Sequence, residues 1–246
     1  MKKYINADLF RVSRRIPRWI LIALVLLAMV DIFRPGSNPD STIIELIDLF
    51  EQTIKYVPIY IGFIEMIYIF GDDFAGKTAP IAIGTGITRN QVIIGKWIEA
   101  IMVVAVDTIM IAVISLPLCG IAAKSLPVAL VGEALIHMFV AVLSTAAYMA
   151  LVFPIMYSMQ TITVAFLIYI LISSGAINKL IGLLSTTKRL SKLGIDKYTL
   201  TNCINVFRSR MILGSFQWES IVGIIIYVGA FLWLTCFIYK KKELEF

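Results

Sequence analysis

Residues 71–78 read GDDFAGKT, which satisfies the phosphate-loop pattern G-x-x-x-x-G-K-[S/T] of nucleotide-binding proteins. The pattern binds a polyphosphate where it joins a buried strand to a helix, because the backbone N–H groups of the loop then surround the phosphates. Here the segment follows an apolar run of helical length, and the carboxylates of Asp72 and Asp73 stand where the polyphosphate would lie. We therefore expect this chain neither to bind nucleotide nor to hydrolyse ATP.

Six ionisable residues occur inside apolar runs. Asp31 and Glu99 lie close enough to span ends to reach the interface, whereas Glu65, Asp107, Glu133 and His137 lie deeper. A charge in the middle of a bilayer is costly, so such groups usually face a bundle interior or a water-filled cavity. Glu133 and His137 are four residues apart and can hydrogen-bond on one face of a helix. Two interpretations stay open: a polar seam that lines a translocation path, or interhelical hydrogen bonds that hold a bundle together.

Patterns typical of catalysis or metal binding are otherwise scarce. The sequence has a single histidine and no G-x-S-x-G motif, so it predicts no catalytic residues, no metal site and no enzymatic activity. Its three cysteines, Cys119, Cys203 and Cys236, are predicted to be free thiols, since their spacing alone cannot supply the geometry of a disulfide.

The composition defines the class of protein that must position these residues. Of 246 residues, 59% are hydrophobic and 15% are charged, and the mean hydropathy is +0.89. Ordinary soluble domains contain roughly 25% charged residues. The composition excludes disorder, a disulfide scaffold and an ordinary cytosolic enzyme. The basic residues behind the net charge of +6 cluster beside apolar runs, which predicts contact with lipid phosphates and not with nucleic acid.

Apolar runs of helical length predict the architecture. A bilayer core about 30 Å thick requires about 20 apolar residues of helix, or fewer where polar ends reach the interface. Six runs meet this requirement: residues 19–33, 56–70, 97–118, 128–153, 161–173 and 220–239. Pro154 is expected to end the fourth. The sequence therefore predicts an all-α integral membrane protein with six transmembrane helices.

Basic residues beside the spans predict the orientation, because such residues are retained on the cytoplasmic side. They place 12 lysines and arginines inside and 3 on the short outer loops, with both termini cytoplasmic. Residues 174–219 carry seven basic residues and yet lie outside in this topology, and long segments follow the rule less strictly. Ile5, Leu9, Val12 and Ile16 share one helix face, which predicts an interfacial helix on the inner leaflet.

The chain then divides into four parts. These are the cytoplasmic interfacial helix 1–18, the first five spans with the inner loop 71–96 in 19–173, an extracellular helical segment 174–219, and the sixth span with a basic cytoplasmic tail in 220–246.

Two short amphipathic helices are predicted in the extracellular segment, at residues 176–184 and 201–211. We expect this segment to fold over the outer mouth of a pathway and to gate release, because long connections are usually functional. Its basic residues suit lipid phosphates equally well. Residues 41–55 are also amphipathic and are either a second piece of this cap or an extension of the second span.

The inner loop carries an ordered set of residues: an acidic pair, a glycine and threonine, a Gly-x-Thr-Arg turn at 86–89, and a Gly-Lys pair before the third span. The residues that carry this order are Asp72, Asp73, Gly76, Thr78, Gly86, Thr88, Arg89, Gly95 and Lys96. The loop resembles that of the membrane subunits of ABC-2 type transporters, also called type V ABC exporters, and particularly the small six-span permeases of peptide export and bacteriocin immunity systems. Lys77 departs from the family pattern, because it separates Gly76 from Thr78.

The resemblance implies that the loop forms a coupling helix that docks on a separate ATPase subunit, with Lys77 among the contact residues. It implies two ATPase copies, which hold ATP and Mg, and a second permease copy, with a homodimer favoured over a heterodimer. The chain would bind no cofactor itself, would lie in a bacterial plasma membrane, and would export amphipathic or antimicrobial peptides. The alternative is an ion- or proton-coupled secondary transporter that uses the intramembrane carboxylates.

Overall fold

The computed structural model describes residues 2–32, 51–75, 78–122, 128–185 and 198–241, and the regular structure within these ranges is helical throughout. The helices are α1 (Lys2–Ser13), α2 (Ile16–Ile32), α4 (Val57–Glu65), the π-helical turn η1 (Met66–Phe70), α5 (Gly71–Ala75), α6 (Thr78–Gly84), α7 (Arg89–Ala122), α8 (Val128–Met159), α9 (Ile162–Ser173), α10 (Ala176–Ser185), α11 (Leu200–Ile212) and α12 (Trp218–Lys241).

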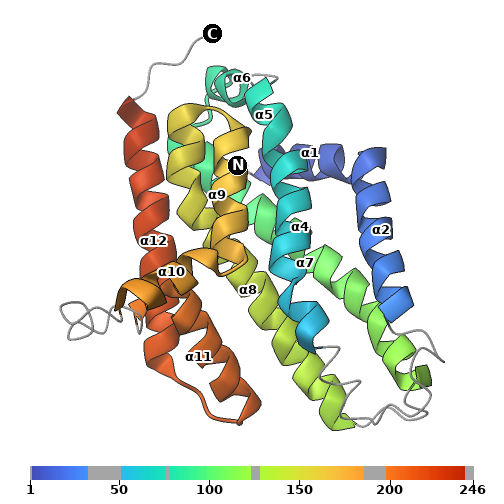
Figure 1. The fold of residues 1–246 in the computed structure, drawn as a ribbon. Coiled ribbons are helices and arrows are strands. Elements are labelled where there is room, and N and C mark those ends of the chain that lie inside the picture. The colour runs from blue at the N-terminus through green and yellow to red at the C-terminus, as the bar shows by residue number, and fades with distance from the viewer. Residues whose placement is uncertain (1, 33–50, 76–77, 123–127, 186–197, 242–246) are drawn as a thin grey trace.

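Helix α8 lies at the centre of the bundle, in contact with α4, α7, α9, α11 and α12 (Figure 1). Helix α1 lies across the bundle, and α2 packs against α4 and α7. The short helices α5 and α6 lie at the end of the bundle where α12 finishes, which we call the α6 end. Helices α10 and α11 lie toward the opposite end, which we call the α11 end.

Four helices in the described residues are long and apolar enough to cross a membrane: 51–70, 89–118, 131–159 and 218–241. A fifth results if the pair 162–173 and 176–183, which is bent by 62°, counts as one span. The apolar stretch Ile16–Leu27 of α2 is also helical, but it is shorter than these four helices. The structure therefore indicates a membrane-embedded helical protein with four or five spans, and the six-span arrangement remains a prediction.

The predicted end of the fourth span at Pro154 is wrong, because α8 continues through this proline to Met159. Phe153 and Met156, on either side of Pro154 in the sequence, are fully buried, so tertiary packing holds the helix where the proline removes one hydrogen bond. The helix ends instead where Gln160 adopts a left-handed conformation, with φ of 52°.

The inner loop is also more helical than the sequence predicted. Helix α7 begins at Arg89 and not near Trp97, so residues 89–96 form its first two turns. Helices α5 and α6 take up most of the remainder. The cause is a start signal at Thr88, which is described with the site below.

Short helices occupy the other predicted stretches. Helices α10 and α11 cover residues 176–184 and 201–211. Helix α1 covers Ile5, Leu9 and Val12 of the amphipathic N-terminal stretch but ends at Ser13, and Ile16 begins α2 instead. The side of the membrane on which each lies remains a prediction. Within 41–55, residues 51–55 are helical and 41–50 lie outside the described residues. Cys203 and Cys236 are free thiols, and the side chain of Cys119 lies outside the described residues.

Close packing joins α4 to α9 at one glycine. The hydroxyl of Tyr169 on α9 donates a hydrogen bond to the carbonyl oxygen of Pro58 on α4. A Cβ atom on Gly62, one turn farther along α4, would lie 1.7 Å from the Tyr169 hydroxyl oxygen. Only a glycine at position 62 therefore allows the two helices this separation.

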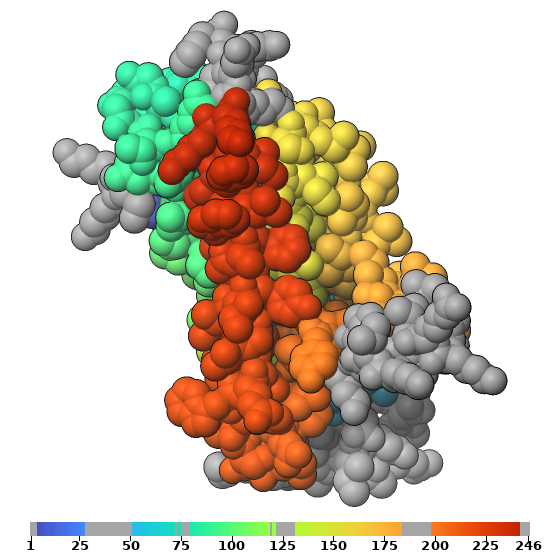
Figure 2. All heavy atoms as spheres, turned by 90° about the vertical axis from the view of Figure 1, so that its left-hand side faces the viewer, coloured from blue at the N-terminus to red at the C-terminus, as the bar shows by residue number. Residues whose placement is uncertain are grey.

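The surface along α12 is apolar. Figure 2 shows this helix along its whole length. Helices α6 and α7 lie on one side of its upper part and α8 and α9 on the other, and α12 contacts both α7 and α8. Large exposed side chains on it include Val222, Ile225, Ile226, Trp233 and Phe237. Such a face suits contact with lipid chains.

Candidate functional site

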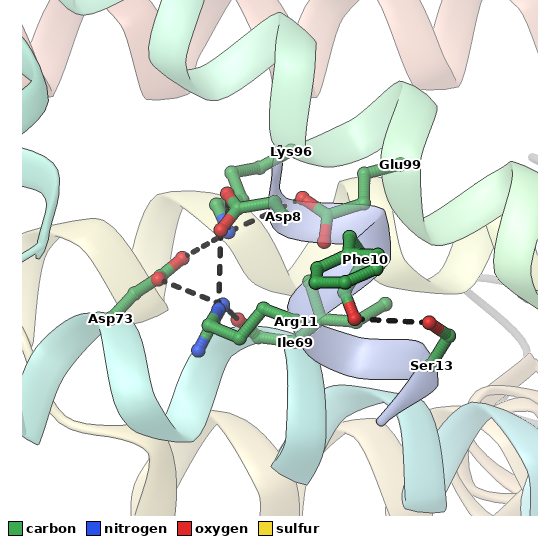
Figure 3. A network of polar contacts seen from close by, with 8 residues as sticks. All are labelled: Asp8, Phe10, Arg11, Ser13, Ile69, Asp73, Lys96 and Glu99. Carbon is green, nitrogen blue, oxygen red and sulfur yellow. Dashed lines mark hydrogen bonds and ion pairs between the residues drawn. The ribbon is translucent and has the colours of Figure 1, made fainter. Parts of the chain in front are cut away.

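Charged side chains from α1, α5 and α7 meet inside the α6 end (Figure 3). The ammonium group of Lys96 is fully buried, 2.5 Å from an oxygen of Asp8, 2.7 Å from Asp73 and 3.2 Å from Glu99. Asp8 lies on α1, Asp73 on α5, and Lys96 and Glu99 on α7. Because each partner comes from a different helix or turn, one ammonium group joins three elements. We call Asp8, Arg11, Asp73, Lys96 and Glu99 the interfacial network.

Arg11 completes this network from the N-terminal helix. Its Nε lies 3.2 Å from Asp8, and its Nη2 lies 3.3 Å from Asp73 and 3.5 Å from the carbonyl oxygen of Ile69. The ring of Tyr4 lies 5.7 Å from the Lys96 ammonium group. Burial, together with the charges of Asp73 and Asp8, raises the pKa of Tyr4, so its hydroxyl stays protonated.

A second polar group lies farther along α7 and consists of Arg18, Glu65 and Asp107, which we call the buried triad. Arg18 Nε lies 2.8 Å from Glu65, and Arg18 Nη2 lies 2.7 Å from both oxygens of Asp107. The side chains are 3%, 0% and 0% exposed. Arg18 opens α2, Glu65 ends α4 and Asp107 lies within α7, so the triad fastens these three helices together.

A common spacing relates the two groups. Glu65 and Asp73 are eight residues apart on one segment, and Glu99 and Asp107 are eight residues apart on another. Eight residues correspond to about two helical turns, or about 12 Å along the axis. Each polar layer therefore receives one carboxylate from each segment and its arginine from the N-terminal part of the chain.

The turn between α6 and α7 is built by the sequence Gly86-Ile87-Thr88-Arg89. Gly86 has φ of 96°, which a residue with a Cβ rarely adopts. Thr88 and Gln91 form a capping box: Gln91 accepts from the Thr88 N–H at 3.0 Å, and Thr88 accepts from the Gln91 N–H at 3.3 Å. This signal starts α7 at Arg89.

Arg89 fastens this turn to the end of α12. Its Nη1 donates to the carbonyl oxygens of Tyr239 at 2.9 Å and Lys240 at 3.0 Å, which belong to the last turn of that helix. Its guanidinium carbon also lies 5.8 Å from the centre of the Tyr239 ring. A cation at the C-terminal end of a helix is favourable, because the unpaired carbonyl groups there carry partial negative charge.

Aromatic rings connect the same end of the bundle internally. Tyr157 on α8 contacts Phe74 on α5 at a centroid distance of 5.7 Å and Tyr239 on α12 at 5.1 Å. Phe70 of η1 meets Phe153 of α8 at 5.2 Å. A displacement of α5 would therefore be transmitted to α8 and α12 through rigid, packed side chains.

The inner-loop residues that were predicted to contact an ATPase lie in several separate places. Asp73 and Lys96 point into the interfacial network, and Arg89 points to α12. Asp72 and Thr78 lie in α5 and α6, although their side chains are outside the described residues, as are Gly76 and Lys77 altogether. Three of the predicted contact residues thus hold the chain's own helices together.

The predicted intramembrane residues separate into two places. Glu65 and Asp107 come together in the buried triad, whereas Glu133 and His137 lie toward the start of α8. Within the part of the chain that the structure describes, no hydrogen bond joins Glu133 to His137. Ser144, farther along α8, donates to the carbonyl oxygen of Val140 on its own helix.

His137 has charged neighbours from other segments, namely Glu51 before α4 and Arg208 on α11. Burial lowers the pKa of Arg208, while nearby Tyr148 and Glu51 act in the opposite direction. In the described ranges, no group of three or more histidine, cysteine, aspartate or glutamate side chains has the arrangement of a metal site.

Sequence reasoning missed Arg18, Asp8 and Glu99 as members of these groups. In the sequence, Arg18 is one of the basic residues that precede the first apolar run, and Glu99 lies near the start of the third, yet both side chains are buried. The repeated eight-residue spacing of Glu65 and Asp73 and of Glu99 and Asp107 could have indicated Glu99, whereas no such spacing includes Arg18 or Asp8. No protein-family model matches the chain, and no curated protein matches it significantly.

Proposed function

We propose that the chain is the membrane-spanning permease subunit of an ATP-driven exporter of the ABC-2 type, and that a separate ATPase subunit moves it. Its cargo would be amphipathic or antimicrobial peptides. Two permease copies and two ATPase copies would form the complex, with ATP and Mg in the ATPase, in a plasma membrane with both termini cytoplasmic. The observation that carries the proposal is the buried ion-pair linkage of the inner hairpin to the rest of the bundle.

The linkage supports the proposal because it connects the α6 end to several helices, so that a movement of this end would move them too. Lys96 and Asp73 join α5 to α7 and α1, and Arg89 joins the α6–α7 turn to α12. A force applied to the hairpin would therefore act on helices at both sides of the bundle. A chain without a nucleotide-binding domain of its own needs such a connection in order to receive mechanical work from a partner.

Helix α6 offers the contact surface. Ala79 and Ala82 pack against Val92 of α7, which fixes one face of this short helix to the bundle. Ile81 on the outer face is 64% exposed, and Thr85 and Thr88 beside it are also exposed. An apolar side chain among small polar residues suits a moderate inter-subunit contact with a polar rim.

The test is purification of the tagged full-length chain from native membranes, followed by identification of co-purifying proteins. We expect a stoichiometric soluble ATPase. The variant Ile81→Glu should abolish this association without unfolding the chain, because the side chain is exposed. Leu183→Glu is the matched control: Leu183 is 67% exposed on α10, toward the other end of the bundle, and its replacement should leave the association unchanged.

A secondary transporter coupled to ions or protons is the second candidate, and the buried triad favours it. Paired charges inside a membrane often mark ion or proton pathways. Transport of substrate by the purified chain in vesicles, driven by an ion or pH gradient without any ATPase, would establish this candidate and exclude the first.

A further inference from the structure

The charges of the buried triad do not balance. Arg18 supplies one positive charge, whereas Glu65 and Asp107 would supply two negative charges if both were ionised. Both carboxyl groups lie on the same guanidinium, at 2.8 Å and 2.7 Å, and none of the three side chains is more than 3% exposed. An uncompensated charge in such a place is strongly unfavourable.

No other basic residue in the described ranges pairs with either carboxylate. Lys96 on α7 and Arg11 on α1 belong to the interfacial network and are bound there to Asp8 and Asp73. The described residues therefore leave one positive charge missing from the buried triad.

The arrangement of the oxygens shows where that charge would sit. Glu65 Oε2 is buried and has no donor, while Oε1 is bound to Arg18. The carboxyl groups of Glu65 and Asp107 approach each other at the Arg18 guanidinium, which both of them bind. Two ionised oxygens in such contact repel, whereas a proton on one of them turns the contact into an O–H···O⁻ hydrogen bond.

The neighbouring hydroxyl group offers no substitute donor. Thr108, next to Asp107, donates to the carbonyl oxygen of Val104 on its own helix at 2.7 Å. The residues around Glu65 on α4 and η1, Ile61, Ile64 and Met66, are apolar and buried. Glu65 also directly precedes the π-helical turn, a distortion that is frequent at functional sites.

We propose that Glu65 and Asp107 together bind one proton, so that the buried triad is a neutral assembly of guanidinium, carboxylate and carboxylic acid at neutral pH. The proton is taken up from water when the three helices come together. This inference goes beyond the proposed function and does not depend on it, because the triad holds its proton whether or not an ATPase drives the chain.

The experiment is infrared spectroscopy of the purified full-length protein in lipid nanodiscs at neutral pH, in H₂O and in D₂O. A buried carboxylic acid gives a C=O stretching band apart from that of ionised carboxylates, and the band shifts on deuteration. We expect Glu65→Gln and Asp107→Asn each to remove the same band, because either variant leaves one carboxylate for one guanidinium. Glu219→Gln, at an exposed position, should retain it.

If the proton is shared, each single variant removes the band. If one residue alone were a carboxylic acid, only the variant of that residue would remove it. A band that persists in either variant, or is absent from the wild-type protein, would overturn the proposal. Misfolding of both amide variants would also contradict it, since an amide preserves shape and the neutral state. If the wild-type protein lacks the band and is stabilised by sodium or potassium chloride while Glu65→Gln is not, a metal ion occupies the place assigned to the proton.

Discussion

The ammonium nitrogen of Lys96 lies 2.5 Å from a carboxylate oxygen of Asp8, and this contact fastens the transverse helix α1 to the first turns of α7. Three carboxylates converge on the buried ammonium group, and each lies on a different turn or helix. An amphipathic helix held only by its apolar face could slide on the bundle. The ion pair fixes its position instead, because a buried charge cannot leave its partner at low cost.

Replacement of Lys96 should therefore be severe. Lys96→Met keeps much of the side-chain volume but removes the buried ammonium group that Asp8, Asp73 and Glu99 share. We expect a loss of about 3–5 kcal/mol in the free energy of unfolding, measured by thermal or denaturant unfolding of the purified protein in detergent. Lys179→Met, at an exposed position of α10, is the control and should change stability by less than about 0.5 kcal/mol. Equal effects of the two variants would show that the network contributes nothing.

The start of α7 depends on the hydroxyl of Thr88. Thr88→Ala removes one half of the capping box with Gln91 and should cost about 1 kcal/mol. Amide hydrogen exchange over the first turn of α7 should become faster, because the N–H of Gln91 loses its acceptor, while exchange in α8 stays slow. Thr88→Ser keeps the hydroxyl and serves as the control. Unchanged exchange in Thr88→Ala would mean that the packing of Val92 alone fixes this helix start.

The sequence was sufficient to predict where most of the helices lie, but not all of their ends or their contacts. Hydropathy and the amphipathic spacing of Ile5, Leu9 and Val12 depend on neighbours along the chain, so they indicate where helices form and which faces are apolar. The pairing of Arg18 with Glu65 and Asp107 depends on which helices become neighbours in space, and local periodicity carries no such information. The end of α8 was misplaced for a similar reason, because packing around Phe153 and Met156 outweighs the local effect of Pro154.

The contact between α4 and α9 makes Gly62 sensitive to the smallest substitution. Gly62→Ala would place Cβ 1.7 Å from the hydroxyl oxygen of Tyr169 and 2.6 Å from its Cζ atom. We expect a loss of about 1–3 kcal/mol in thermal unfolding, because the ring is fully buried and cannot move aside freely. In the double variant, Tyr169→Phe removes the hydroxyl oxygen and should restore part of the lost stability. The restoration should be incomplete, because the Cζ atom remains close to the added Cβ. Gly132→Ala on α8, with no atom within 4 Å of the added Cβ, should not destabilise the protein.

Labelling of introduced cysteines tests the orientation on which the permease proposal depends. In a chain without native cysteines, Ile81→Cys on α6 and Leu213→Cys after α11 place thiols at positions that are 64% and 74% exposed, toward opposite ends of the bundle. If the α6 end is cytoplasmic, a membrane-impermeant maleimide added to intact cells should modify Cys at 213 and spare Cys at 81. Permeabilised cells should then show equal modification at both, because both side chains are exposed. The reverse pattern would place the α6–α7 hairpin outside the cell, where no ATPase could drive it.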